Sequence, residues 1–171
     1  MNTELDNNRE FYFENIDELV SHLYSLFGKL TPLKLQKSLY FLFSFYSGIY
    51  SGEDESGVQE ESYDMPKYLF DADFEAWTYG PVIPEVYKKN KYDGGYESKE
   101  YDFDENKTTD NEIDKFIQDV GGQIVGMSDF ALVDRSHEDI TWKKSIEQRN
   151  SAPMKREDIA SEYRKLITEK N

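Results

Sequence analysis

Two histidines and several carboxylate-rich stretches are the parts of this chain whose residue types could do chemistry. His22 and His137 show neither the H-x-x-x-H nor the H-E-x-x-H spacing of a helical zinc site. Glu138 and Asp139 follow His137 and could form a local acid–base cluster with it. A turn histidine that hydrogen-bonds the backbone is the better interpretation. The chain has no cysteine, which removes thiolate nucleophiles and Cys-based zinc sites.

Two acidic stretches resemble the beginnings of metal sites. Residues 71–75 are similar to the start of a calcium loop, but Ala76 stands where the loop needs glycine and Val82 where it needs a bidentate acid. Residues 93–99 are faintly similar to a nuclease triad, but they are glycine-rich and polar, whereas such triads lie on apolar strands. We therefore expect no catalytic residues, no metal and no cofactor, and a protein that is not an enzyme.

Charge excludes further classes of function. The chain has 20 Lys and Arg against 35 Asp and Glu, a formal net charge of −15. Such a chain repels phosphate backbones and anionic lipid, so direct nucleic-acid binding and membrane binding are not expected. Residues 39–50 form the longest apolar run and are too short to span a bilayer. We expect a cytoplasmic protein whose partner is another protein, and a basic one.

Helical periodicity dominates the rest of the chain. We expect a flexible leader over residues 1–14 and one compact, mainly α domain over 15–171, with a small β element near residues 68–79. Asn15 and the Thr31-Pro32 pair mark the starts of two helices, which should pack as an αα-hairpin. Further helices are expected after Pro84, from Thr109, after Ser128, around Trp142 and from Arg156, with a break or bend at Gly121-Gly122. An acidic loop is expected over 53–64, and an acidic loop or a weak hairpin over 92–107.

Residues 74–87 are the most distinctive segment. Alternation predicts a strand on which Phe74 and Ala76 point one way while Glu75, Trp77 and Tyr79 point the other. Gly80-Pro81 should end that strand, because proline cannot donate to a ladder. Pro84 then suits the first position of a helix that carries Tyr87. Aromatic side chains with polar tips are common anchors at protein interfaces, so Trp77, Tyr79, Glu75 and Tyr87 are the candidate partner contacts.

Three segments together resemble one known family. They are residues 30–41 (LTPLKLQKSLYF), residues 73–87 (DFEAWTYGPVIPEVY) and residues 136–144 (SHEDITWKK). Their order and spacing are similar to those of the SocA-like, or Panacea, antitoxin domain, which is found in phage-associated proteins. The resemblance extends over about residues 15–168. The motif residues to which we assign a structural role are Thr31, Pro32, Gln36, Gly80, Pro81, Pro84, His137 and Trp142.

The resemblance implies a helical domain that neutralises a toxin protein by binding it, and in some members a proteolytic adaptor that delivers the toxin to a protease. It brings no catalytic residues. The acidic charge leaves a second hypothesis open: a phage-encoded inhibitor that mimics DNA and blocks a host nuclease or defence enzyme, such as a restriction or CRISPR effector. An enzyme is the third hypothesis, and the absence of a convergent polar site in the sequence disfavours it.

Overall fold

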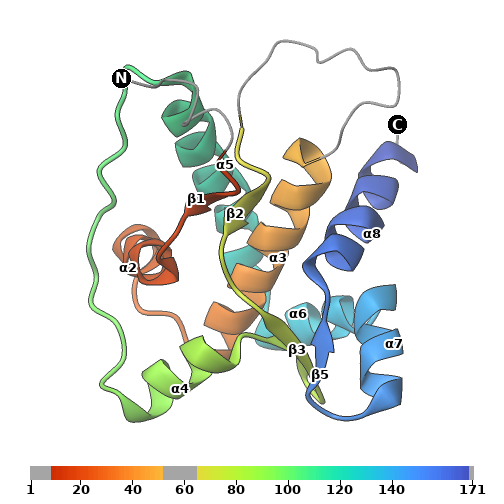
Figure 1. Cartoon of the computed structure of the whole chain (residues 1–171). Helices are drawn as coiled ribbons and strands as arrows, with labels where there is room; N and C mark the ends of the chain where they lie inside the picture. Colours follow the sequence, from red (N-terminus) through yellow and green to blue (C-terminus); the bar gives the residue numbers. More distant parts are fainter. Residues whose placement is uncertain (1–8, 52–64, 170–171) are drawn as a thin grey trace.

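Figure 1 shows the computed structural model, which describes residues 9–51 and 65–169. This part of the chain is mainly α, with seven helices that make up 60% of it and a few short strands, so the expected fold class is confirmed. The helices are α2 (Ile16–Phe27), α3 (Pro32–Tyr50), α4 (Pro84–Tyr92), α5 (Thr108–Val125), α6 (Asp129–Ser136), α7 (Ile140–Gln148) and α8 (Arg156–Glu169). The strands are β1 (Phe11–Phe13), β2 (Tyr68–Phe70), β3 (Phe74–Trp77), β4 (Gly80–Val82) and β5 (Ala152–Met154).

Local signals set most helix ends. The side chains of Asn15, Thr31 and Ser128 each accept a backbone N–H from the first turn of the helix that follows. These bonds satisfy donors that have no partner within the helix. Pro32 occupies the first turn of α3, where its missing N–H costs nothing. Gly28 ends α2 with a φ of 80°, a conformation that glycine adopts without strain.

Helix α3 is the centre of the molecule, and other elements surround it (Figure 1). It packs most extensively against α8 and also contacts α5, α6, α4, β2 and β4. Aromatic rings fill the space between α3 and the strands: Phe43 stacks on Tyr68 with centroids 5.4 Å apart and meets Phe74 edge-on at 5.2 Å. A helix that is apolar on nearly every face is stable only when it is enclosed in this way.

Two small sheets flank α3. β1 and β2 run parallel, with Phe11 opposite Tyr68 and Phe13 opposite Phe70. In the second sheet β3 lies between β4 and β5 and is antiparallel to both. The predicted β element near residues 68–79 therefore exists, but its two strands belong to different sheets. Their partners β1, β4 and β5 are strands of three residues, too short to show a periodic pattern.

Four local expectations need correction. Tyr12 and Phe13 are buried in β1, so part of the stretch expected as a leader belongs to the fold. α2 lies nearly end-on in Figure 1 and packs on β1 and α5 instead of forming an αα-hairpin with α3. α5 continues through Gly121-Gly122, and glycine at 121 leaves room for the Phe27 ring, which would lie 3.3 Å from a Cβ there. Gly80-Pro81 opens a new strand, which Pro81 can join because β4 is at the sheet edge.

The segment from 93 to 107 is a loop, the first of the two expected alternatives, and runs along the outside of α2 (Figure 1). Backbone and side-chain bonds hold it in place. The Lys99 N–H donates to the Ser21 carbonyl at 3.0 Å, and the Tyr101 N–H donates to Nδ1 of buried His22 at 2.9 Å. His22 therefore supports a loop. The acidic stretch expected as a loop over 53–64 lies outside the described residues.

We predict that Gly48→Ala destabilises the protein by about 1–3 kcal/mol, the usual cost of overpacking. A Cβ at residue 48 would lie 2.6 Å from Cδ1 of Ile167 and 2.9 Å from the backbone of Tyr163, so α3 and α8 would have to separate. Gly122→Ala is the control, since its Cβ would meet only the Phe27 ring, at 3.9 Å. That helix substitution should be neutral or stabilising by up to about 1 kcal/mol. Urea unfolding measures both, and equal effects would contradict the close crossing of the two helices.

Candidate functional site

The β3–β4 hairpin is the point where the distinctive sequence segments meet. Thr78 and Tyr79 form its two-residue turn, and Trp77 pairs with Gly80 across it. Gly80 has a φ of 114°, and a Cβ there would lie 2.5 Å from Oγ of Ser136 and 2.8 Å from Cε of Lys37. Both the turn geometry and the close approach of α3 and α6 therefore require glycine. The hairpin therefore packs between α3 and α6.

Side chains from α3 occupy the outer edge of β4. Gln36 makes a two-bond contact with the backbone of Ile83: the Ile83 N–H donates to Oε1 at 2.8 Å, and Nε2 donates to the Ile83 carbonyl at 3.2 Å. Lys37 Nζ donates to the Pro81 carbonyl at 2.9 Å. Buried backbone groups need such partners. Gln36 and Lys37 supply here what a further strand would supply, so this edge is closed to strand addition.

Lys37 is an unusual choice for this position. Its side chain is 1% exposed, and no described carboxylate lies within ion-pairing distance of its ammonium. Burial lowers the pKa of Lys37 from 10.5 to about 8, because the charged form loses hydration. The ammonium is still mostly protonated at pH 7. A positive charge therefore lies directly beneath the hairpin.

The turn between α6 and α7 holds the tip of the hairpin from the other side. The indole N–H of Trp142 donates to the Trp77 carbonyl at 2.9 Å, and Nε2 of His137 lies 3.1 Å from the Thr78 carbonyl. The His137 and Trp142 rings stack with centroids 4.2 Å apart and planes 15° apart. Both residues thus position the hairpin, and His137 acts as the expected turn histidine that bonds the backbone.

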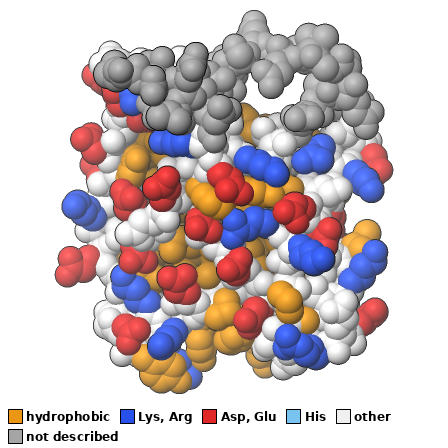
Figure 2. Space-filling model, viewed as in Figure 1, with side chains coloured by type: hydrophobic (Ala, Val, Ile, Leu, Met, Phe, Trp, Pro, Cys, Tyr) orange, Lys and Arg blue, Asp and Glu red, His pale blue; other side chains and the backbone are white. Residues whose placement is uncertain are grey.

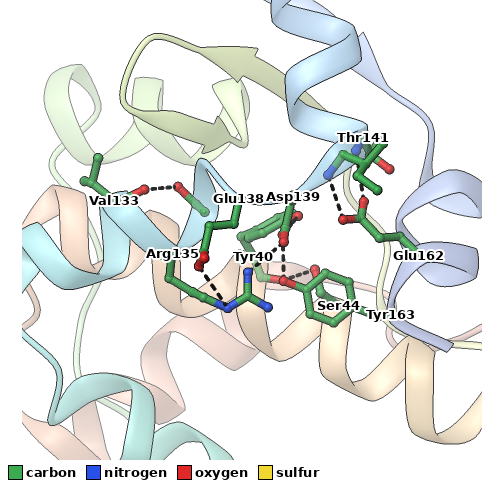
Figure 3. Close-up of polar contacts among 11 residues, drawn as sticks. Tyr40, Ser44, Val133, Arg135, Glu138, Asp139, Thr141, Glu162 and Tyr163 are labelled. Carbon is green, nitrogen blue, oxygen red and sulfur yellow. Dashed lines mark hydrogen bonds and ion pairs between the residues drawn. The ribbon is translucent and has the colours of Figure 1, made fainter. Parts of the chain in front are cut away.

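Asp139 anchors that turn in the core (Figure 3). Its carboxylate is 3% exposed and accepts hydrogen bonds from Tyr163 at 2.6 Å, from Tyr40 and from Arg135 at 2.8 Å. Burial raises the pKa of the Asp139 carboxyl, while these three donors oppose the rise. Nearby, Glu162 accepts the first two backbone N–H groups of α7, at 2.7 and 2.9 Å. The Asp139 carboxylate, at the start of α7, thus connects this turn to Tyr40 of α3, Arg135 of α6 and Tyr163 of α8.

The outer side of the hairpin carries aromatic groups. The Trp77 and Tyr87 rings meet edge to face with centroids 5.0 Å apart, and Nε1 of Trp77 donates to Glu75 at 2.9 Å. Tyr79 lies at the turn tip and is 69% exposed. We call Glu75, Trp77, Tyr79 and Tyr87 the aromatic hairpin surface. The structure places these four predicted contacts around one hairpin, but Tyr79 is in the turn rather than on the strand face shared by Glu75 and Trp77.

The predicted motif residues all lie in or beside the elements that build this site. Thr31 and Pro32 start α3, Pro84 starts α4, and Pro81 is buried in β4. Sequence reasoning missed Lys37, because it lies near the start of α3 beside the polar residues Gln36 and Ser38 and nothing in this pattern signals its burial. It also missed the role of Asp139, because nothing local distinguishes that carboxylate from the chain's other acids.

Residues 59–143 match the family model described as antitoxin SocA-like, Panacea domain. The protein contains a Panacea domain. The match includes the aromatic hairpin surface, His137 and Trp142, whereas Gln36 and Lys37 of α3 lie before it. The curated proteins and the solved structures that were compared with the chain yielded no match. The Panacea domain and the helix before it thus form a single structural site.

The described residues contain neither a membrane-spanning helix nor a group of side chains suited to a metal ion. No helix of the described residues is long and apolar enough to cross a membrane. Over residues 9–51 and 65–169, no three or more His, Asp or Glu side chains are grouped so that they could hold a metal ion. Polar side chains around the β3–β4 hairpin instead donate hydrogen bonds to backbone carbonyls, as Gln36, Lys37 and Trp142 do.

We predict that burial of Lys37 makes stability depend on pH. The folded-state pKa of about 8 lies below the unfolded value of 10.5, so the unfolded chain binds more protons between these pH values. Stability conferred through Lys37 therefore rises with pH over this window. Relative to Lys37→Met, the wild-type free energy of unfolding should increase by about 2 kcal/mol from pH 7.5 to 9.5. Urea titrations at both pH values measure it, and a constant difference would contradict an uncompensated buried ammonium.

We also predict that Asp139→Ala destabilises the Panacea domain by about 3–5 kcal/mol, because it leaves Arg135 and two buried phenols without their acceptor. Asp134→Ala is the matched control: it removes an exposed carboxylate from α6, the helix that precedes the turn, and should change stability by less than about 0.5 kcal/mol. Chemical unfolding of both variants provides the comparison. Equal losses would show that Asp139 does not anchor the turn.

Proposed function

We propose that this protein acts as an antitoxin that neutralises a partner toxin by direct binding, and that the aromatic hairpin surface makes the contact. The observation that carries the proposal is Tyr79, an aromatic side chain that is 69% exposed at the tip of a tightly held turn. Tyrosine and tryptophan are enriched at interface hot spots, where they bury large areas at low entropic cost. The Panacea domain match supports an antitoxin role and a protein partner.

Preorganisation is a second reason to favour this surface. The hairpin backbone is bonded by Gln36, Lys37, Trp142 and His137, so little conformational freedom remains to be lost on binding. The indole N–H of Trp77 already donates to Glu75. A partner can therefore cover the indole without leaving its polar atom unsatisfied.

A binding role, rather than catalysis, is part of the proposal. His137 is the residue most suited to acid–base chemistry, and its ring is stacked on Trp142 with Nε2 against a backbone carbonyl. Asp139 is directed into the core, where tyrosine and arginine side chains occupy both of its oxygens. These contacts support structural roles for the two residues, and we propose that the protein is not an enzyme.

The net charge of −15 supports a basic toxin as the partner. A strongly acidic protein attracts a basic one over long distances and speeds their encounter. Exposed carboxylates of the 93–107 loop, such as Glu97, Glu100 and Asp102, contribute to this field. The association rate should therefore fall as ionic strength rises.

The proposal extends to a proteolytic adaptor role, in which the bound toxin is passed to a protease. This extension rests on the family resemblance. It is tested separately, by asking whether the purified protein accelerates degradation of its toxin by proteases of the host. Neutralisation without such acceleration would limit the protein to occlusion of the toxin.

A DNA mimic that inhibits a host nuclease or defence enzyme is the alternative, and the net charge favours it. Mimicry needs carboxylates arrayed like phosphates over an extended face. Figure 2 shows Lys and Arg side chains interspersed with Asp and Glu over the visible face, which is unlike such an array. Competition between this protein and DNA for a restriction enzyme or CRISPR effector would support the alternative.

We predict that Tyr79→Ala abolishes rescue when the chain is co-expressed with the toxic product of a neighbouring gene. Loss of an exposed aromatic hot spot should weaken binding at least tenfold. The fold should survive, because the Tyr79 side chain makes few contacts within the protein. Phe130→Ala is the control, since Phe130 is an aromatic residue of α6 that is 78% exposed. Growth assays and purified-complex affinities measure the effect.

The two variants separate the possible outcomes. Loss of rescue by Tyr79→Ala alone would support the aromatic hairpin surface as the contact. Equal rescue by both variants would move the contact elsewhere on the protein. If the wild-type chain also fails to neutralise or bind the product of any neighbouring gene, the antitoxin proposal is wrong.

A further inference from the structure

Helix α4 presents two different charged faces. On the face toward α2, Lys89 pairs with Asp17 at 2.6 Å and lies over the Tyr96 ring at 4.7 Å. Burial raises the pKa of Tyr96, and the nearby charges of Asp17 and Glu85 raise it further, so Glu85 lies on this side as well. On the face toward the hairpin, Lys91 Nζ donates to the Tyr87 hydroxyl at 3.1 Å. Lys89, on the face toward α2, thus has a carboxylate partner, whereas Lys91, on the face toward the hairpin, bonds a phenol.

Lys91 carries an uncompensated charge beside the aromatic hairpin surface. Its ammonium lies 5.4 Å from the ring centroids of both Tyr87 and Tyr92, and no described carboxylate is within ion-pairing distance of it. Hydrogen bonds to Tyr87 and Tyr92 raise the pKa of Lys91, so it remains charged at neutral pH. The Tyr87 ring in turn packs against the Trp77 ring, with centroids 5.0 Å apart, so the aromatic groups and the Lys91 ammonium form one continuous surface.

Two further charged residues lie at this corner of the molecule. Lys37 places a second unpaired ammonium beneath Pro81, under the hairpin. Glu75, the acidic member of the aromatic hairpin surface, is half-buried, and its carboxylate accepts the Trp77 indole N–H. Figure 2 shows apolar side chains together with basic and acidic ones over α4, at the lower left of the view.

We propose that the aromatic hairpin surface selects a partner segment in which an exposed apolar side chain adjoins a carboxylate, with the apolar group against Trp77 and Tyr79 and the carboxylate on Lys91. The inference rests on the proposed antitoxin function and names the chemistry that its contact site recognises. Recognition must proceed through side chains, since Gln36 and Lys37 already occupy the free edge of β4.

A locally acidic contact is compatible with a partner that is basic overall. Long-range attraction depends on the net charges and governs the encounter rate. Once the proteins touch, charges more than about 8–10 Å apart are largely screened at physiological salt, so the nearest groups determine register. The acidic chain would thus attract a basic protein while Lys91 selects the acidic position within it.

The test measures affinities of purified variants for the protein encoded beside this chain. Lys91→Gln should weaken binding by up to about fivefold, and Lys91→Glu by about tenfold, because reversal adds repulsion to the loss of attraction. Lys165→Glu is the matched control. It changes the net charge equally on the exposed face of α8, across the molecule from α4 in Figure 1, and should change affinity by less than about twofold.

A charge swap then locates the partner group. Each Asp and Glu of the partner is replaced by Lys in turn, and one replacement should restore binding to Lys91→Glu while weakening binding to the wild type. Binding of Lys91→Glu at least as tight as that of the wild type, together with a loss for Tyr79→Ala, would overturn this inference and leave the proposed contact surface intact. If no wild-type complex forms, the proposed function fails and this inference fails with it.

Discussion

The hairpin of β3 and β4 exists because side chains satisfy backbone groups that no neighbouring strand reaches. Gln36 and Lys37 bond the outer edge of β4, and Trp142 and His137 contact the carbonyls that precede the turn tip. A sheet of three short strands cannot otherwise bury such an edge without leaving polar groups unpaired. The surrounding helices position these four side chains around the β3–β4 hairpin. Asp139 fixes the α6–α7 turn, and α3 is enclosed on all sides.

These contacts give the hairpin an inner side that packs against the protein and an outer side that is more exposed. Its inner side is occupied by residues that bond backbone atoms, and these are fully or mostly buried. Its outer side carries Trp77 and Tyr87, which are partly exposed, and Tyr79, which is exposed. Rigidity on one side and exposed aromatic area on the other are the two properties that protein recognition requires. Lys91 adds a charge that no described carboxylate of the protein neutralises.

Local sequence signals predicted the helices well, and non-local contacts explain what they could not predict. Asn15, Thr31 and Ser128 act within the next few residues, so their capping role is visible in sequence. The pairing of β1 with β2 joins residues far apart in the chain, and strands of three residues lack a detectable period. Alternation correctly placed Glu75 and Trp77 on one face of a strand, whereas Tyr79 lies in the turn. The burial of Lys37 was not predicted, because lysine is almost always exposed.

The contacts that hold the hairpin also impose an order on its maturation during synthesis. The hairpin lies between residues 74 and 82, yet its supports come from α3, which is translated earlier, and from His137 and Trp142, which are translated much later. A ribosome-bound chain that ends before residue 142 lacks half of these supports. β5, which completes the sheet, is translated later still. The aromatic hairpin surface therefore acquires its final shape only after residues 152–154 of β5 have emerged from the ribosome.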